Sequence, residues 1–274
     1  MAEVQPPAGA ATTFGPMLQY WRRTRRLSQL ALAHLADVSP RHVCFVETGR
    51  ARPSREMVLL LASALDVPLR ERNALLLAAG FAPVYGETSL DAPEVGAVRE
   101  ALDAILKQQE PYPAVVMDRR WDIRRTNAGA ERFFRFLLVD GFDAAPGNVI
   151  KTVFHPSGLR PYIANWEAVA RTLMHRIQRE ALGGVKDAAA EELVEEVLAY
   201  PDIPASLRTP ALEQPLVPFI PVSFERDGRR FDYFSTVTTL GTPLDVTLQE
   251  LRIECFFPAN KATEERAREL AASV

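Results

Sequence analysis

Hydrophobic residues in the first third of the chain recur every three or four positions, which predicts a run of short amphipathic helices. The residues between them are mostly polar, or are Gly and Pro, which cap helices and form turns. Five helices are predicted on this basis, over residues 14–26, 29–36, 40–48, 54–65 and 70–79. We expect the second helix to bury Leu30, Ala33 and Leu35, and the third to bury Val43 and Val46.

The second and third predicted helices are joined by the two-residue turn Asp37-Val38. Ser39 is suited to cap the third helix, and Pro40 falls at its first position, where a missing N–H does no harm. Gly49 follows this helix and favours a left-handed C-cap. Two short helices joined by a tight turn form the layout of a helix-turn-helix, whose second helix enters the major groove of DNA.

Beyond residues 83–93, which contain Pro and Gly, the pattern becomes mixed. Helical spacing predicts helices over 93–110, 128–139, 187–200 and from about Pro161. Alternation and turn residues predict strands over 114–117, 121–125, 216–226, 229–240 and 246–257. The last of these segments places Leu251, Ile253, Cys255 and Phe257 on one face and Glu250, Arg252 and Glu254 on the other.

These elements predict an α+β fold class overall, with an N-terminal all-α domain of five helices and a C-terminal antiparallel sheet covered by helices. The predicted domains are a flexible arm over 1–13, a helix-turn-helix domain over 14–82, a linker over 83–93 and a second domain over 94–274.

Composition is that of an ordinary globular protein, with 47% hydrophobic and 24% charged residues among 274. No apolar run approaches the roughly 18 residues of a membrane span, and the N-terminal arm lacks the pattern of a signal peptide. Cys44 and Cys255 fall in different predicted domains, so we expect no disulfide and a cytoplasmic protein.

Charge is distributed unevenly along the chain. Residues 1–85 hold ten Lys and Arg against six Asp and Glu, a net +4, and the rest hold 22 against 29, a net -7. Between Tyr20 and Arg55 eight Arg face two acids, a net +6. A local basic segment in an acidic chain is the expected footprint of a nucleic-acid-binding module.

The outer face of the third helix carries residues suited to DNA. Arg41 can bind guanine through two hydrogen bonds, His42 can donate to a base or phosphate, and Phe45 can contact a thymine methyl, unless it packs on a neighbouring helix. Arg50 and Arg52 follow the helix and suit phosphates. The predicted DNA-binding residues are Gln29, Ser39, Arg41, His42, Cys44, Phe45, Arg50 and Arg52.

With the segments 27–29, 38–39 and 47–50, this region resembles the lambda-repressor-like, or Xre-type, helix-turn-helix domain. The resemblance implies that Gln29 holds the DNA backbone and that Arg22 and Glu47 form a structural ion pair. Pro40 departs from the family, which often has a base-reading Gln there. Base reading is therefore expected of Arg41, Cys44 and Phe45.

The C-terminal order of elements resembles a PAS-like fold. More narrowly, residues 154–161, 165–167, 234–243 and 250–254 resemble the ligand-binding domain of MmyB-like transcription regulators, and the likeness spans about 92–258. It implies a cytosolic bacterial regulator with an apolar cavity able to hold a small hydrophobic molecule, a fatty acid being one candidate. No other cofactor and no metal is implied.

The residues that suit such a cavity are aromatic and apolar, although each also suits a plain core. They are Phe133, Phe134, Phe136, Leu137, Phe154, Trp166, Leu173, Phe219, Phe231, Tyr233 and Phe234. For an anionic head group the expected cluster is His155, Arg160 and Asn165.

The sequence shows no phosphate-binding glycine loop, nucleophile elbow or His-Glu metal motif, so an enzyme is not predicted. The function predicted is a transcription regulator that binds double-stranded operator DNA, nucleoid-associated when bound, and senses a hydrophobic effector. A homodimer on two half-sites is expected, since one recognition helix covers few base pairs. The alternative is a regulator whose second domain is a ligand-free dimerisation or protein-interaction platform.

Overall fold

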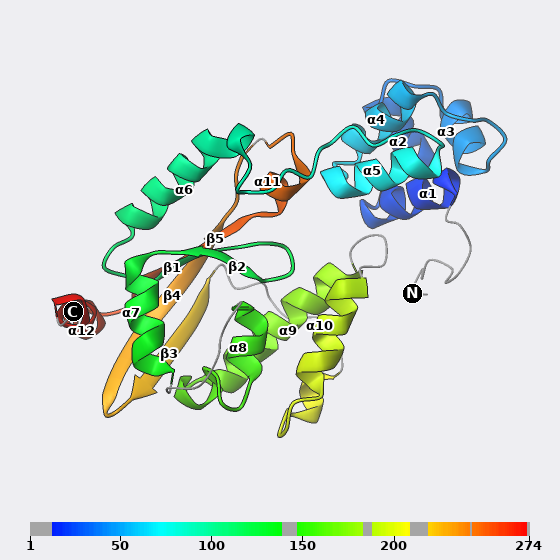
Figure 1. Ribbon diagram of the computed structural model, residues 1–274. Helices are drawn as coiled ribbons and strands as arrows, with labels where there is room; N and C mark the ends of the chain where they lie inside the picture. The colour runs from blue at the N-terminus through cyan, green and yellow to red at the C-terminus, as the bar shows by residue number, and fades with distance from the viewer. Residues whose placement is uncertain (1–12, 139–146, 183–187, 209–218, 242, 273–274) are drawn as a thin grey trace. The chain divides into compact units, whose positions relative to one another are not determined.

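The computed structural model describes residues 13–138, 147–182, 188–208, 219–241 and 243–272. The chain divides into two compact units (Figure 1). The first contains Met1–Thr88 and Pro243–Gln249, and the second contains Ser89–Thr242 and Glu250–Val274. The division at residue 88 falls within the expected linker, but the inclusion of Pro243–Gln249 in the first unit was not expected from the sequence.

The first unit is built from the five helices that the hydrophobic pattern predicts. They are α1 (Phe14–Thr24), α2 (Gln29–Leu35), α3 (Pro40–Glu47), α4 (Arg55–Ala64) and α5 (Leu69–Ala78). Three serines begin helices as caps: Ser28 Oγ accepts from Ala31 N, Ser39 Oγ from His42 N and Ser54 Oγ from Met57 N. Gly49 takes a left-handed conformation after α3, with φ of 72°.

The core of this unit corrects one prediction about α2. Leu30 and Leu35 are 55% and 60% exposed, whereas Leu32 and Ala33 are buried. The helix is short and turns the face that contains Leu32, Ala33 and Ala36 inward, so its other leucines lie on the outside. Val43 and Val46 of α3 are buried as predicted.

The second unit is formed around a five-stranded antiparallel sheet in the order β2-β1-β5-β4-β3. Its strands are β1 (Ala114–Met117), β2 (Ile123–Thr126), β3 (Ile220–Arg226), β4 (Arg229–Thr238) and β5 (Arg252–Pro258). Strands β3 and β4 form the hairpin predicted around Asp227-Gly228, where both residues have positive φ. Strand β5 lies in the middle and pairs with β1 on one side and β4 on the other.

The segment over 246–257 is only partly the strand that its alternation predicts. A short helix, α11 (Val246–Glu250), precedes β5. Val246 N donates to Gly86 O at 2.8 Å, and Asp245 Oδ1 accepts from Leu248 N, so this helix is capped and held within the first unit. The strand therefore begins only at Arg252.

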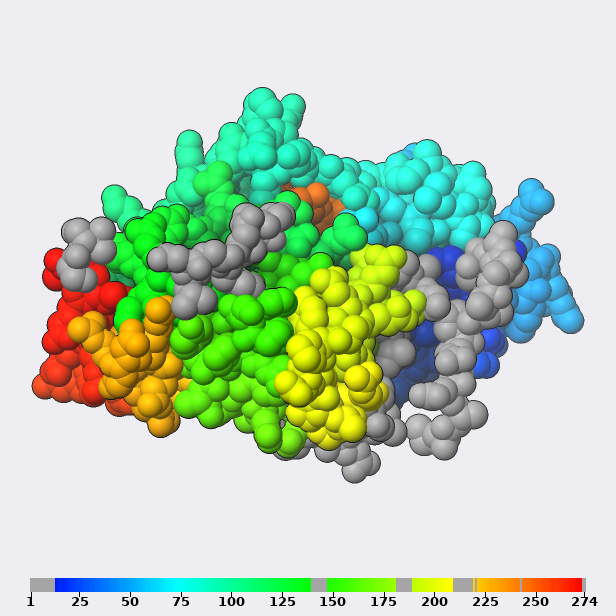
Figure 2. Space-filling model, turned by 60° about the horizontal axis from the view of Figure 1, so that its bottom comes forward, coloured from blue at the N-terminus to red at the C-terminus, as the bar shows by residue number. Residues whose placement is uncertain are grey.

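Helices cover the sheet of the second unit, and Figure 1 draws α6 on the opposite side of it from α8, α9 and α10. In Figure 2, α10 in yellow lies on the surface of this unit. The α-helices are α6 (Gly96–Gln108), α7 (Ala128–Leu137), α8 (Val149–Phe154), α9 (Trp166–Leu182), α10 (Ala188–Leu198) and α12 (Lys261–Ala272), with 3-10 turns at Pro93–Val95, Arg160–Tyr162 and Ala205–Leu207.

Three differences from the predicted helices stand out. The helix expected from about Pro161 begins only at Trp166, after a 3-10 turn. Helices α8 and α12 were not predicted, although Asn148 caps α8 by accepting from Lys151 N. Among the described helices, none is both long and apolar enough to span a bilayer.

Candidate DNA-binding surface and ligand cavity

A buried ion pair fixes the N-terminal helix against the third helix of the first unit. Arg22 Nε and Nη2 lie 2.6 and 2.9 Å from Glu47 Oε1 and Oε2, and the Glu47 side chain is fully buried. Hydrogen bonds to Glu47 raise the pKa of the Arg22 guanidinium. Gln29 Nε2 donates to Glu47 Oε2 at 2.7 Å, so Gln29 links the start of α2 to this pair. Arg22 and Glu47 thus form the ion pair that the family resemblance implied.

The exposed face of α3 gathers two arginines around one aromatic ring. The guanidinium carbons of Arg41 and Arg50 lie 5.0 and 6.0 Å from the centre of the Phe45 ring. Both arginines are exposed, and Phe45 is half-buried. The ring therefore holds two cations at the surface, where they can meet phosphates or base edges.

The other predicted DNA-binding residues lie on or beside this helix. His42 and Cys44 are half-buried on α3, and Arg52 is exposed in the loop that follows. Ser39 lies at the N-terminus of α3, where its hydroxyl accepts from His42 N as the cap. Together with Gln29, Arg41, Phe45 and Arg50, these residues define what we name the α3 surface.

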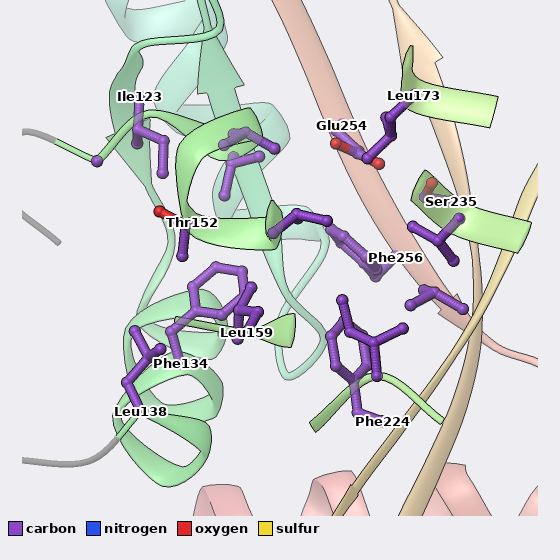
Figure 3. Close-up of a pocket in the computed structure, with 17 residues that line it drawn as sticks. Ile123, Phe134, Leu138, Thr152, Leu159, Leu173, Phe224, Ser235, Glu254 and Phe256 are labelled. Carbon is purple, nitrogen blue, oxygen red and sulfur yellow. The ribbon is translucent and has the colours of Figure 1, made fainter. Parts of the chain in front are cut away.

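The second unit contains an apolar cavity of about 500 Å³ on one face of the sheet (Figure 3). All five strands, helices α7, α8 and α9, and the loop before α9 contribute residues to its lining. The lining residues are Val115, Ile123, Phe134, Leu138, Gly147, Val149, Thr152, Val153, Leu159, Ile163, Val169, Leu173, Val222, Phe224, Ser235, Glu254 and Phe256. This size is within the usual range of small-molecule sites.

Glu254 is the acidic residue among these described lining residues. It lies on the central strand β5 and is 9% exposed. Burial raises the pKa of its carboxyl, and this outweighs the hydrogen bond from the Ser235 hydroxyl and the positive charge of Arg176, which both lower it. The cavity thus presents a carboxyl group whose pKa is raised by burial.

The structure places two of the predicted cavity residues, Phe134 and Leu173, in this lining. Phe133 and Phe154 lie in the adjacent core, where Phe133 makes edge contacts with Phe224, Phe231 and Tyr233. Trp166 is buried and donates through Nε1 to Val153 O. Phe234 instead stacks on Phe257, which faces away from the cavity residue Phe256.

The cluster expected for an anionic head group is not among the lining residues. Arg160 donates to the carbonyl oxygens of Pro201 and Asp202 and stacks on Trp166 at 4.4 Å. Asn165 bridges to β3 by donating to Pro221 O and accepting from Ser223 N. These side chains therefore tie the loop before α9 to the turn after α10 and to the sheet.

His155 is a local anchor of the same loop. Its Nδ1 accepts from Ser157 N at 3.1 Å, and its ring makes an edge contact with Tyr200. The described residues contain no group of three His, Cys, Asp or Glu that could hold a metal ion.

The polar cavity residues Glu254, Ser235 and Thr152 were not predicted. The alternation along β5 predicted that Glu254 shares a face with Arg252, but it did not indicate on which face of the sheet the cavity lies. The sequence did contain a signal for this position. Glu254 lies two residues before Phe256 on the same strand, so the two side chains share a face, and both line the cavity.

Comparison with known proteins adds the family. A family model described as the MmyB-like transcription regulator ligand binding domain matches residues 98–270. The chain belongs to this family. A helix-turn-helix model matches residues 18–72, so the α3 surface lies in a recognised DNA-binding module ahead of the MmyB-like domain.

No curated protein matches the chain. A solved structure titled "Structure of an RNA-binding Light-Oxygen-Voltage Receptor" is similar at 11% identity, with a TM-score of 0.27. That match covers 95% of this chain, which spans about 62% of the other protein's length.

Proposed function

We propose that this MmyB-like protein regulates transcription by binding double-stranded DNA through the α3 surface and a small hydrophobic effector in the cavity of the second unit. The observation that carries this proposal is the apolar cavity of about 500 Å³ inside the ligand-binding domain of a chain that also contains a helix-turn-helix. The cavity volume suits an apolar molecule about as long as a medium-chain fatty acid, and a fatty acid is one candidate of that size.

The arginines of the α3 surface support the DNA-binding part. Arg41 lies within α3, where a recognition helix presents side chains to base edges, and Arg50 and Arg52 follow it, where phosphate contacts are common. A homodimer on two half-sites would double the few base pairs that one such helix reads.

Chain connectivity supports a link between effector and DNA binding. Strands β4 and β5 both contribute to the cavity, through Ser235 on one and Glu254 and Phe256 on the other. The chain between these strands enters the first unit with Pro243–Gln249. An effector changes DNA affinity if it binds one arrangement of β4 and β5 better than another, and this connection would carry the change.

The first test is organic extraction of freshly purified protein followed by mass spectrometry, compared with a mock preparation. A stoichiometric apolar molecule supports the effector site, and its removal and return must then change affinity for a duplex selected from random sequences. An extract without enrichment, together with DNA affinity indifferent to added apolar compounds, would favour the dimerisation or protein-interaction platform instead.

A matched pair of variants locates the molecule. Val169→Phe fills the cavity from α9, whereas Ile105→Phe adds the same kind of bulk to α6 at a residue that is 36% exposed. We expect the bound molecule to be lost from the first variant and retained by the second. Equal retention in both would place the molecule elsewhere.

A further inference from the structure

We propose that Glu254 is the polar anchor of the cavity and that it selects an uncharged apolar molecule bearing a hydroxyl, carbonyl or amide group over a carboxylate of the same chain length. This inference rests on the proposed function, because it takes the cavity to be the effector site. The residue belongs to the segment 250–254 that the sequence already singled out, but no role for it followed from that segment.

The position of Glu254 on the sheet aims its carboxyl at the cavity. Glu254 pairs directly with Val115 of β1, and residues opposite each other in an antiparallel pair share a face. Val115 and Phe256, two residues further along β5, are also lining residues. Figure 3 shows Glu254 and Ser235 on one side of the cavity and Thr152 on the other, with apolar side chains between them.

The rest of the described lining is apolar or uncharged, with no Lys, Arg or His among it. A carboxylate ligand would lose its hydration in the cavity, would find no cation among these lining residues to pair with, and would also face Glu254. A neutral polar group meets no such penalty. Glu254 can accept a hydrogen bond from such a group, and it can also donate one when it is protonated, a form that becomes more accessible because burial raises the pKa of the carboxyl.

The guanidinium groups in the same part of the domain already have partners. Arg252, on the same face of β5, and Arg176, one turn beyond Leu173 on α9, both pair with Glu180, at 3.0 and 3.4 Å. Both also stack against the Trp121 ring at 4.9 Å. Arg252 Nη1 is buried without a hydrogen-bond partner among the described residues, which makes it the competing position for an anionic head group.

The test compares three probes with the same chain, 1-dodecanol, dodecanoate and dodecylamine, by calorimetry on the full chain after its bound molecules are extracted. At pH 7.5 we expect dodecanol to bind at least about tenfold more tightly than dodecanoate. Because dodecanoate would enter as the neutral acid, its affinity should fall about tenfold per pH unit above its pKa, while that of dodecanol stays level.

Two variants assign the preference to Glu254. Glu254→Gln keeps a donor and an acceptor at the same place, so dodecanol affinity should stay within about threefold, whereas Glu254→Leu should lower it about tenfold. Glu225→Gln, at an exposed site on β3, is the matched control and should change neither affinity. Circular dichroism establishes that each variant is folded.

Two results would overturn the inference while leaving the proposed function intact. Tighter binding of dodecanoate, removed by Arg252→Met, would place an anionic head group on that guanidinium. Tightest binding of dodecylamine, removed by Glu254→Gln, would make Glu254 the counter-ion of a cationic ligand. If no probe binds and the extract is empty, the effector site itself is refuted, and the inference falls with it.

Discussion

Gln249 and Leu69, 180 residues apart, are joined by a hydrogen bond of 2.7 Å from Leu69 N to Gln249 Oε1. The N-cap of α5 is Pro68, which has no side-chain acceptor, and Gln249 takes that role from the chain between β4 and β5. A helix of the DNA-binding unit therefore begins on a residue that the sequence places beside the strands of the ligand cavity. Asp245 strengthens this attachment by accepting from Thr88 N and Thr88 Oγ1.

Replacement of Gln249 should loosen the start of α5. We expect Gln249→Ala to destabilise this helix by about 1 kcal/mol, the usual effect of losing a cap. Hydrogen exchange of the Leu69 amide measures it directly, because this amide loses its acceptor. Thr247→Ala, in the same short helix, is the control. Unchanged protection of Leu69 in the Gln249 variant would contradict the capping role.

The Arg22–Glu47 pair should dominate the stability of the first unit. Glu47→Ala leaves the buried Arg22 guanidinium without its counter-charge, and we expect a loss of about 3–5 kcal/mol. Gln29→Ala removes one hydrogen bond to the same carboxylate and should cost about 1–3 kcal/mol. Hydrogen exchange of the α3 amides in increasing denaturant reports this unit separately. Similar losses in the two variants would show that the charge pair is not the main term.

Replacement of Gly15 by alanine should destabilise the first unit. A Cβ at this position on α1 would overlap the carbonyl oxygen of Glu47, so the two helix backbones approach too closely for any side chain. We expect Gly15→Ala to lower the free energy of unfolding by about 1–3 kcal/mol. Gly96→Ala is the matched change, because a Cβ there meets only Arg99 Nη2 at 3.7 Å, and it should be neutral or stabilising.

The first unit could be predicted closely because its signals are local. The helix ends are marked by Ser28, Ser39 and Gly49, which lie within a few residues of the hydrophobic positions of the same helices. Leu30 and Leu35 were assigned to the core because hydrophobicity alone does not say which stripe of a seven-residue helix turns inward.

Predictions for the second unit failed where contacts distant in sequence decide. Val246 begins a helix and not a strand, and its backbone N–H donates to the carbonyl oxygen of Gly86, 160 residues earlier. The local alternation of hydrophobic and polar residues cannot predict a contact with so distant a residue. Glu254 was correctly placed on the face opposite to that of Cys255, but alternation along one strand does not show which face lines a cavity, because that depends on helices α7, α8 and α9. His155 and Arg160 looked suited to a ligand, but His155 is engaged by its own loop and Arg160 by the turn after α10.

Arg41 and Arg50 should have different effects on DNA binding. Arg41→Ala should reduce discrimination against substituted bases by about 1–3 kcal/mol at one position, because a bidentate contact to guanine is lost. Arg50→Ala should weaken binding to all duplexes alike. It should also reduce the slope of log affinity against log salt concentration by the amount expected for about one phosphate contact. Binding of a panel of single-base variants at two salt concentrations distinguishes them. Unchanged selectivity in the Arg41 variant would move base reading elsewhere on the α3 surface.

The stability of the second unit should carry a pH signature of Glu254. The folded-state pKa of this carboxyl is raised above its unfolded value of about 4.3, chiefly by burial. The folded state therefore binds its proton more tightly, and the resulting stability is fully present below the unfolded pKa and is lost as pH rises through the folded pKa. Glu254→Gln has no proton to lose at this site.

We therefore expect the free energy of unfolding of the variant, relative to that of the native chain, to increase with pH over this window and then level off. Hydrogen exchange of β5 amides in urea, at a series of pH values, measures the difference for this unit alone. Other titrating groups, such as Asp232, are present in both proteins and cancel to a first approximation. Parallel curves would mean that Glu254 titrates alike in the folded and unfolded chain, and its carboxyl would then be hydrated in the cavity instead of buried against apolar walls.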